Sequence, residues 1–302
     1  MNDTGLAEKI RALARRLHAV ILVHNYQRDE VQEIADFLGD SLDLSRKAAR
    51  TAAEIIVFCG VHFMAETAAI LCPDRLVLLP DLDAGCPMAD MITPEGLRDL
   101  KARHPGAVVA AYVNTSAAVK AEADICVTSA NAAEIVSRLP ADREIIFIPD
   151  QYLAASVSKK TGRKLIAWPG YCPTHVGILS EDIEREKRLH PAALVMVHPE
   201  CPAATSDAAE EVLSTSGMVR FARESSAREF IVGTEVGLIS RLQRENPEKV
   251  FYPATERAVC PNMKRITLEK VLWSLEDRQF EIKVPEEIRV KAKRAVAAML
   301  AV

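Results

Sequence analysis

Short apolar runs alternate along the chain with longer stretches in which the apolar residues have helical spacing. The runs predict strands, which in chain order are residues 19–23, 54–58, 75–80, 107–111, 125–128, 144–148, 164–168, 193–197, 229–232 and 249–252. The stretches between them predict helices, among them one over 31–38 that Gly39 would close and one that Asp40 or Ser41 would cap. This alternation is typical of parallel sheets with right-handed crossover helices.

Polar residues and cysteines in the loops after these runs repeat with a long period. Three polar residues at strand ends lie 88 and 86 residues apart, and a hydroxyl residue follows each of them 17 positions later. Three cysteines, each followed by proline, recur at intervals of 86 and 88 residues. The three sets are His24, Tyr112 and His198; Ser41, Ser129 and Thr215; and Cys86, Cys172 and Cys260. Because ligands gather at the carboxyl ends of parallel strands, these residues can share one site.

A repeat of this length predicts an α/β fold with three homologous αβα units, each built on a parallel sheet. The units would be related by pseudo-threefold symmetry around a common centre. We place them at residues 1–88, 89–176 and 177–264, and we expect the C-terminal helices in 265–302 to pack on the first unit.

Composition and charge narrow the function. Of the 302 residues, 49% are hydrophobic but only 5% are aromatic, which fits the aliphatic cores of α/β domains. A net charge of −4 gives no sign of a nucleic-acid or membrane-surface partner. The polar N-terminus and the absence of an apolar run of about 18 residues predict a cytoplasmic protein without a membrane span.

Seven cysteines, an odd number, argue against a disulfide framework and leave metal binding, catalysis or burial. Cys59 and Cys126 lie inside strand runs and Cys72 ends a helix, so we expect all three to be structural. Cys201 adjoins His198 and should lie near the site, although it has no counterpart in the other repeats.

The recurring cysteines Cys86, Cys172 and Cys260 are the candidate ligands of a metal centre. No Cys-x-x-Cys pair and no run of close cysteines is present, which disfavours a zinc ribbon and a ferredoxin site. Three thiolates on a [4Fe–4S] cluster would leave one iron open, and that iron could act as a Lewis acid on a hydroxyl or carboxylate. Ligand count alone also allows one zinc ion with three cysteines and a water.

The ordered motifs around these residues resemble those of the quinolinate synthase family over essentially the whole chain. The marks are His24-Asn25-Tyr26-Gln27, Gly39-Asp40-Ser41-Leu42, Tyr112-Val113-Asn114-Thr115, Thr128-Ser129-Ala130-Asn131, His198-Pro199-Glu200-Cys201 and the three Cys-Pro loops. The resemblance implies three αβα domains around a [4Fe–4S] cluster and a transferase of de novo NAD biosynthesis. That enzyme condenses iminoaspartate with dihydroxyacetone phosphate to quinolinate, with loss of phosphate and two waters.

The same resemblance implies a role for each site residue. The three recurring cysteines would hold three irons, and the fourth iron would bind substrate. The proton-transfer residues would be Tyr26, His198 and Glu200. The substrate-binding residues would be His24, Ser41, Tyr112, Val113, Asn114, Ser129, His198, Pro199, Glu200 and Thr215. An aspartate oxidase or dehydrogenase could supply the iminoaspartate.

This chain departs from some family members at the last ligand. Those members carry a Cys-x-x-Cys-x-x-Cys group there, whereas this chain has Cys260-Pro261-Asn262-Met263, with one cysteine. A thiol switch of that form is therefore not expected, although the cluster ligand is retained.

Two other functions stay open from the residues alone. One is a hydro-lyase that uses a three-cysteine cluster or zinc on a small hydroxy acid, and the other is an iron–sulfur sensor without a substrate. A sensor would have no need for the polar residues near the cysteines, which are His24, Tyr26, Asn114, His198 and Glu200.

Some candidate residues have a structural alternative. Ser41, Ser129 and Thr215 could be helix N-caps, a role that is compatible with ligand binding at the same strand-to-helix corner. His175 follows Cys172 by three positions, and it could face the cluster or be a satisfied core histidine.

Overall fold

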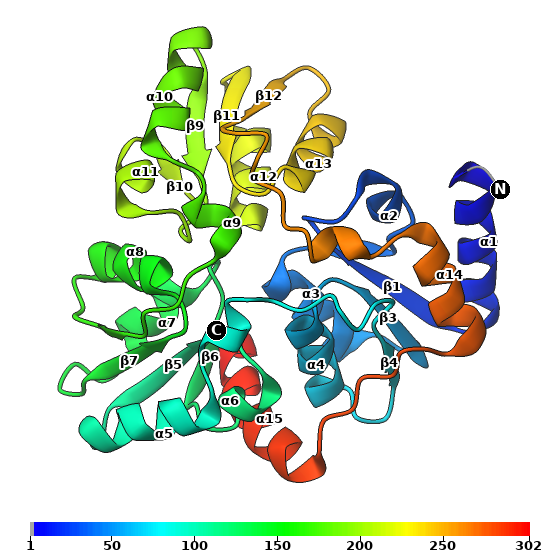
Figure 1. Ribbon diagram of the computed structural model, residues 1–302, viewed down its shortest axis with the longest axis horizontal. Coiled ribbons are helices and arrows are strands. Elements are labelled where there is room, and N and C mark those ends of the chain that lie inside the picture. The colour runs from blue at the N-terminus through cyan, green and yellow to red at the C-terminus, as the bar shows by residue number, and fades with distance from the viewer. Residues whose placement is uncertain (1–2) are drawn as a thin grey trace.

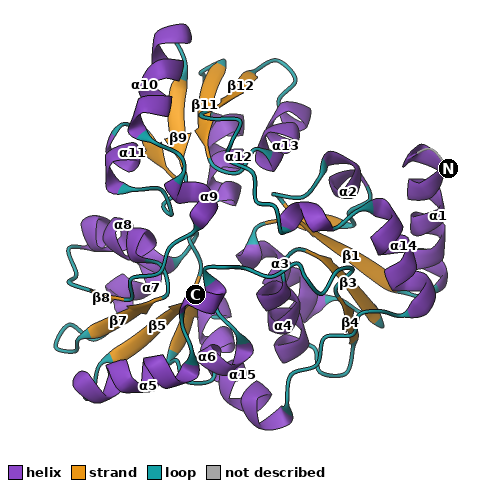
Figure 2. Ribbon diagram, viewed as in Figure 1, coloured by secondary structure: helices purple, strands orange, loops and turns teal. Residues whose placement is uncertain are grey.

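The structure is a computed structural model that describes residues 3–302. Three units stand around a common centre, and each has a four-stranded sheet with helices on both faces (Figures 1 and 2). Every strand pair in the three sheets is parallel. The predicted α/β fold class is therefore confirmed.

The three sheets share one strand order, in which the first strand of each unit lies between its second and third strands. The first unit contains β1 (Ala19–His24), β2 (Phe37–Gly39), β3 (Ile55–Cys59) and β4 (Leu76–Leu78), with α1 (Asp3–Arg16), α2 (Asp29–Glu33), α3 (Ser41–Arg50) and α4 (His62–Leu71). The second contains β5 (Val108–Tyr112), β6 (Ile125–Val127), β7 (Ile145–Ile148) and β8 (Ile166–Ala167), with α5 (Pro94–Arg103), α6 (Ala117–Lys120), α7 (Ala132–Arg138), α8 (Gln151–Thr161) and α9 (Pro173–Val176). The third contains β9 (Leu194–Val197), β10 (Glu211–Val212), β11 (Glu229–Gly233) and β12 (Val250–Pro253), with α10 (Ser180–Leu189), α11 (Ala203–Asp207), α12 (Thr215–Glu224) and α13 (Gly237–Glu245).

The strand runs predicted from the sequence are confirmed, but the helix predicted over 31–38 is wrong. Its helix, α2, ends at Glu33, and residues 37–39 form the edge strand β2 beside β1. Val31 and Ile34 are buried at helical spacing, which is the pattern that suggested a longer helix. The short edge strand β10 was also not predicted.

An acidic residue just before each edge strand ties that strand to the centre of its sheet. In each unit the carboxylate accepts the backbone N–H of a residue 15 positions earlier, at 2.7–2.8 Å, and the acid's own N–H returns to that residue's carbonyl oxygen at 3.0–3.1 Å. The three pairs are Asp36 with Ile21, Asp124 with Val109, and Glu210 with Val195. This double hydrogen bond stops any helix before the edge strand and fixes the strand's register.

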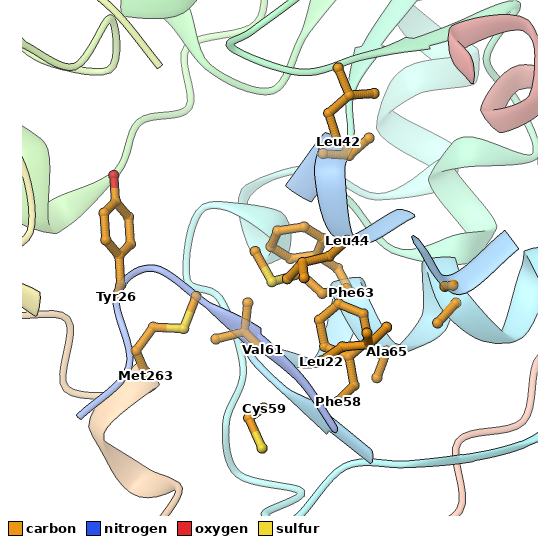
Figure 3. Packing of buried hydrophobic residues seen from close by; sticks show 14 of the residues in the cluster. Leu22, Tyr26, Leu42, Leu44, Phe58, Cys59, Val61, Phe63, Ala65 and Met263 are labelled. Carbon is orange, nitrogen blue, oxygen red and sulfur yellow. The ribbon is translucent and has the colours of Figure 1, made fainter. Parts of the chain in front are cut away.

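The core of the first unit is aliphatic and aromatic side chains from both layers. Leu22 of β1, Phe58 of β3, and Leu44 and Phe63 of the covering helices are at most 3% exposed. Figure 3 shows these side chains packed together, while the ring of Tyr26 stands apart with its hydroxyl pointing away from them. The core thus ends where the polar residues after the strands begin.

Two helices follow the third sheet and return to the earlier units. Helix α14 (Leu268–Asp277) lies against α1 and β3, and α15 (Glu286–Leu300) packs against α4, α6 and β6 (Figure 1). The unit limits 1–88, 89–176 and 177–264 stay predictions. In the described part of the chain, no helix has the length and apolar character needed to cross a bilayer.

Because α15 joins two units, truncating its buried face should weaken the whole chain. Met299 is 0% exposed, and we expect Met299→Ala to lower the free energy of unfolding by about 2–5 kcal/mol. The urea midpoint measures this change. Val290 on the same helix is 42% exposed, so Val290→Ala should stay within about 0.5 kcal/mol of wild type. Equal midpoints for the two variants would show that the buried face of α15 does not hold the two units together.

Candidate functional site

A cavity of about 140 Å³ lies where the three units meet, and each unit contributes side chains to its wall. The sequence-predicted residues that line it are His24, Tyr26, Ser41, Cys86, Tyr112, Asn114, Ser129, Cys172, His198, Glu200, Thr215 and Cys260. Val113 and Pro199 lie between lining residues without lining the cavity themselves. The repeat in the sequence therefore corresponds to one shared site.

The ends of strands and the starts of helices deliver the polar side chains. His24 and Tyr112 end β1 and β5, and His198 directly follows β9. Ser41 and Thr215 are the first residues of α3 and α12, but they do not cap these helices. The caps are the preceding residues, since Asp40 Oδ1 accepts the N–H groups of Leu42 and Asp43 at 3.0 and 2.9 Å. Ser214 likewise accepts the N–H of Gly217 at 3.2 Å in α12.

Because the preceding residues cap these helices, the side chains of Ser41 and Thr215 lie at the cavity wall. Ser129 also lines the cavity, and the residue at the N-cap position of α7 is Asn131. Thr215 Oγ1 accepts a hydrogen bond from Asn25 Nδ2 at 2.8 Å, and Asn25 Oδ1 accepts one from Arg241 at 2.6 Å. Contacts between the first and third units thus orient one of the site's hydroxyls.

One backbone hydrogen bond recurs at each cysteine loop. The residue three positions after the third strand of each unit donates its N–H to the carbonyl oxygen two residues before the cysteine, at 2.8–2.9 Å. The three bonds run from His62 to Ala84, from Gln151 to Gly170, and from Val236 to Ala258. Each donor lies at the start of a helix, where an N–H group has no partner inside the helix. The same contact therefore satisfies the helix and fixes the loop.

The three cysteines form a donor set that fits an iron–sulfur cluster. All three are free thiols on the cavity wall, one from each unit. Burial raises the pKa of the Cys86 thiol to about 12 and also raises the pKa values of Cys172 and Cys260. A bound cation is what would favour their thiolate forms here.

The spacing of the thiols can be compared with that expected around a single metal ion. Three sulfurs on one tetrahedral zinc ion would lie about 3.8 Å apart, given Zn–S bonds of about 2.3 Å. Within residues 3–302, the group whose donor atoms all lie within 4.8 Å of one another is instead Cys172, His175 and Glu200. The three cysteines do not form such a group, so at least one pair of their sulfurs is more than 4.8 Å apart.

Glu200 is a buried charge at the centre of the polar residues. Its Oε1 accepts the hydroxyl proton of Tyr112 at 2.5 Å, and its Oε2 lies 2.9 Å from His175 Nδ1. Burial by itself favours the neutral acid, but the histidines around Glu200 and the hydroxyl of Tyr112 hold its pKa well below the usual range. Glu200 is therefore a carboxylate whose two oxygens are held by two donors.

Two further histidines are neutral and have defined tautomers. Burial lowers the pKa of His24 to about 3 and the pKa of His198 to about 3, although nearby Glu200 opposes both shifts. Each accepts a backbone N–H at Nδ1, from Tyr26 at 3.2 Å and from Glu200 at 3.4 Å respectively. Nε2 then carries the proton in both rings. In His198 this proton can be donated to Ser129 Oγ, 3.2 Å away.

The cavity has donors for anions but no cationic side chain. No lysine or arginine lines it within the described residues. The N-termini of α3 and α12, each ten residues long, begin at the cavity wall and favour negative groups. Asn114 Oδ1 is buried and has no hydrogen-bond partner within the described chain, so it can accept a donor from a ligand.

Several lining residues were not among the predicted set. They include Asp40, Phe63, Met64, Thr128, His175, Glu235 and Met263. His175 is 2% exposed, and its Nδ1 lies 3.1 Å from Cys172 Sγ, so the site-facing alternative for this histidine is the one observed. Glu235 Oε1 accepts the N–H of Cys260 at 3.1 Å, and no sequence motif predicted this contact. Cys201 is buried without lining the cavity.

The sequence of this chain is similar to those of known proteins. A family model described as Quinolinate synthetase A protein matches residues 8–301. The chain belongs to the quinolinate synthase family. Curated proteins named quinolinate synthase include one from Dehalococcoides mccartyi (strain CBDB1), 56% identical over 98% of both chains. One from Thermus thermophilus is 55% identical and one from Methanosarcina barkeri is 54% identical, over 100% of this chain and 99% of each relative.

Membership of the quinolinate synthase family agrees with the full-length resemblance seen in the motifs. The chain and these relatives cover one another almost completely, so all three units and the shared cavity fall inside the matched region.

The loop before Cys172 should not tolerate a side chain at Gly170, whereas the equivalent residues of the other two loops are alanines. A Cβ on Gly170 would overlap the carbonyl oxygen of Pro149. The carbonyl oxygen of Gly170 also accepts the hydrogen bond from the N–H of Gln151. We expect Gly170→Ala to lower the free energy of unfolding by about 1–3 kcal/mol in a urea titration. Gly177→Ala is the control on the other side of Cys172, since its Cβ would make only ordinary contacts, and it should stay within about 0.5 kcal/mol. Equal free energies of unfolding for the two variants would show that a Cβ at Gly170 does not disturb the loop.

Proposed function

We propose that this chain is a quinolinate synthase that condenses iminoaspartate with dihydroxyacetone phosphate on a [4Fe–4S] cluster. The products are quinolinate, phosphate and two waters. The equation balances in atoms and needs neither an oxidant nor a reductant. Aspartate oxidation, by an oxidase or a dehydrogenase, would supply the iminoaspartate, and the product would enter NAD biosynthesis.

The observation that carries the proposal is the convergence of three free cysteines and a set of acid–base groups on one cavity. Three units, each with the same strand order, contribute one cysteine apiece. A sensor would need the cysteines alone, whereas this cavity also contains Tyr26, Glu200 and His198. The family relatives named quinolinate synthase support the same reading.

Cys86, Cys172 and Cys260 would hold three irons of the cluster, each from a loop that is pinned to its own sheet. When bound, the cluster would supply a Lewis-acidic iron that polarises a hydroxyl or carboxylate group. The protein's part is to keep the three thiols fixed and to place polar groups beside them.

Substrate binding would use the hydroxyl, amide and imidazole groups on the cavity wall. Carboxylate and phosphate groups would lie at the starts of α3 and α12, where the N–H groups of each helix point outward. The proposed binding residues are His24, Ser41, Tyr112, Val113, Asn114, Ser129, His198, Pro199, Glu200 and Thr215. Val113 and Pro199 do not line the cavity, so their contribution would come from the backbone.

Proton transfer would depend on Tyr26, Glu200 and His198. Imine formation and two dehydrations require protons to be removed from carbon and delivered to leaving hydroxyls. Glu200 is the ionised acceptor, while burial and Glu200 raise the pKa values of Tyr26 and Tyr112 well above the usual range. Both phenols therefore remain protonated and can donate.

Metal content is the first test of the cluster. Protein purified without oxygen should contain about four irons and four sulfides per chain, and Cys86→Ala, Cys172→Ala and Cys260→Ala should each lose them. Cys72→Ala is the matched control, because Cys72 Sγ donates to the carbonyl of Ala48 and does not line the cavity. A single zinc ion, or a colourless protein that cannot be reconstituted, would contradict the cluster and favour a three-cysteine zinc hydro-lyase.

Glu200→Gln tests the acid–base part separately. Glutamine keeps the size of the side chain but cannot take up a proton, so quinolinate formation should fall by at least about 100-fold while iron content stays unchanged. Glu210→Gln is a control in the same unit, because the carboxylate of Glu210 accepts a backbone N–H of β9 and does not line the cavity. This variant should retain activity. Unchanged turnover in Glu200→Gln would remove this residue from the catalytic set.

A further inference from the structure

One further set of side chains repeats with the three units and lies outside the cavity. Gln32, Lys120 and Ser206 are 88 and 86 residues apart, which are the intervals that separate the polar residues at the strand ends. Each lies in the short helix that follows the first strand of its unit, α2, α6 or α11. None of the three lines the cavity. Their recurrence therefore needs an explanation other than contact with a ligand.

Each of these side chains holds the same point of the backbone. We call residues 24–27, 112–115 and 198–201 the polar turns, and the carbonyl oxygen of the last residue in each turn accepts a hydrogen bond from the residue five positions later. Gln32 Nε2 donates to Gln27 at 3.0 Å, Lys120 Nζ donates to Thr115, and Ser206 Oγ donates to Cys201 at 3.4 Å. The position of donor and acceptor is the same in all three units, although the donor group differs. A turn outside the sheet needs such a partner for its carbonyl group.

The third residue of each polar turn faces the cavity, and these residues are Tyr26, Asn114 and Glu200. The hydroxyl of Tyr26 lies 2.6 Å from that of Thr234. Glu200 accepts the hydroxyl proton of Tyr112 at 2.5 Å. By contrast, Asn114 Oδ1 is buried without a hydrogen-bond partner among residues 3–302. The position of Asn114 therefore depends more on the backbone of its own turn than the positions of the other two do.

The donor behind Asn114 is also the most deeply buried of the three sets' charged groups. Lys120 is 0% exposed, as is Thr115, and its Nζ lies 5.4 Å from the ring centroid of Phe63. Burial lowers the pKa of Lys120. The ammonium and the neutral amine both carry N–H groups, so the bond to Thr115 forms in either state. A lysine is rarely buried completely, and this hydrogen bond offsets part of the cost.

We propose that Lys120 is a positioning residue that fixes Asn114 at the cavity wall through the carbonyl group of Thr115. The inference rests on the proposed function, in which Asn114 binds substrate or product. Without the amine, the buried carbonyl of Thr115 would lose this donor and the turn would no longer be held in one conformation. Asn114 would then occupy its binding orientation for only part of the time, and the affinity would fall by that fraction.

The test compares two substitutions at position 120 in the cluster-loaded protein. Lys120→Met keeps the length of the side chain and removes the donor, whereas Lys120→Gln introduces the donor that the first unit has at the equivalent place. We expect Lys120→Met to raise the Kd for quinolinate about 10-fold in calorimetry, with iron content unchanged. Lys120→Gln should stay within about 3-fold of wild type. A wild-type Kd in Lys120→Met, or an equal loss in Lys120→Gln, would overturn the proposal.

A double-mutant cycle tests whether Lys120 acts through Asn114. Asn114→Ala removes the side chain that the turn is proposed to position, so adding Lys120→Met to it should change the Kd for quinolinate by less than about 2-fold. If Lys120→Met weakened binding as much in this background as in wild type, Lys120 would act independently of Asn114 and the proposal would be wrong.

A matched control separates this role from the mere loss of a buried lysine. Lys249 is 7% exposed in the third unit, and its Nζ also donates to backbone carbonyl oxygens, those of Ala222 and Ser225. It does not line the cavity. Lys249→Met should lower the unfolding midpoint and leave the Kd for quinolinate within about 2-fold of wild type.

Hydrogen exchange gives a readout that needs neither turnover nor a ligand. Lys120→Met should speed amide exchange in a peptide that spans residues 112–116, whereas Lys120→Gln and Lys249→Met should leave that peptide as protected as in wild type. Unchanged protection in Lys120→Met would overturn the proposal. If wild-type protein with full iron content neither makes nor binds quinolinate, the proposed function fails, and the exchange comparison still decides whether Lys120 holds the turn.

Discussion

The backbone hydrogen bond that pins each cysteine loop to its sheet is the constraint on which the site depends. A loop that carries a cysteine and a proline lies outside the helices and strands, so its place must be set by contacts with the rest of the fold. The helix that follows the third strand has an N–H group without an internal partner, and this N–H binds the loop carbonyl two residues before the cysteine. Each sheet thereby fixes one cysteine loop, and the placement of the three sheets sets the spacing between the thiols.

The second constraint is the charge of Glu200. A buried carboxylate is stable only where donors surround it, and here Tyr112 comes from the second unit and His175 from the segment between the second and third sheets. The two neutral histidines complete a site in which each ring has a defined tautomer. The charge thus organises groups from different parts of the chain, and the same charge keeps both phenols in their protonated form.

The sequence predicted many of the features that repeat, but it missed three repeating acids and several residues that occur once. Residues such as Cys86, Ser129 and His198 could be found because period and type recur together, and parallel topology then places strand ends side by side. The acids Asp36, Asp124 and Glu210 follow the same intervals, and they would have indicated both edge strands and excluded the long helix over 31–38. Their hydrogen bonds across the sheet outweighed the local helical spacing.

Glu235, which the sequence did not single out, and His175, for which it left two roles open, share a different property. Each contacts a neighbour in another segment: His175 contacts Glu200, and Glu235 accepts the N–H of Cys260. These contacts join separate segments of the chain, and no local sequence pattern encodes them. Only the assembled cavity shows them.

A threefold repeat also explains how one backbone arrangement can carry different side chains at equivalent positions. The position directly after the third strand is Gly60, Pro149 and Thr234, and the pin three residues after the strand is unchanged in all three units. Because the pin uses only backbone atoms, the side chains around it are free to differ without moving the cysteines. The shared part of the repeat therefore accounts for the placement of the cysteine loops, and the differences between repeats account for which side chains face the cavity. The proposed function requires protons to be removed at some positions of the substrate and delivered at others, and a site of three identical corners would lack the asymmetry for this.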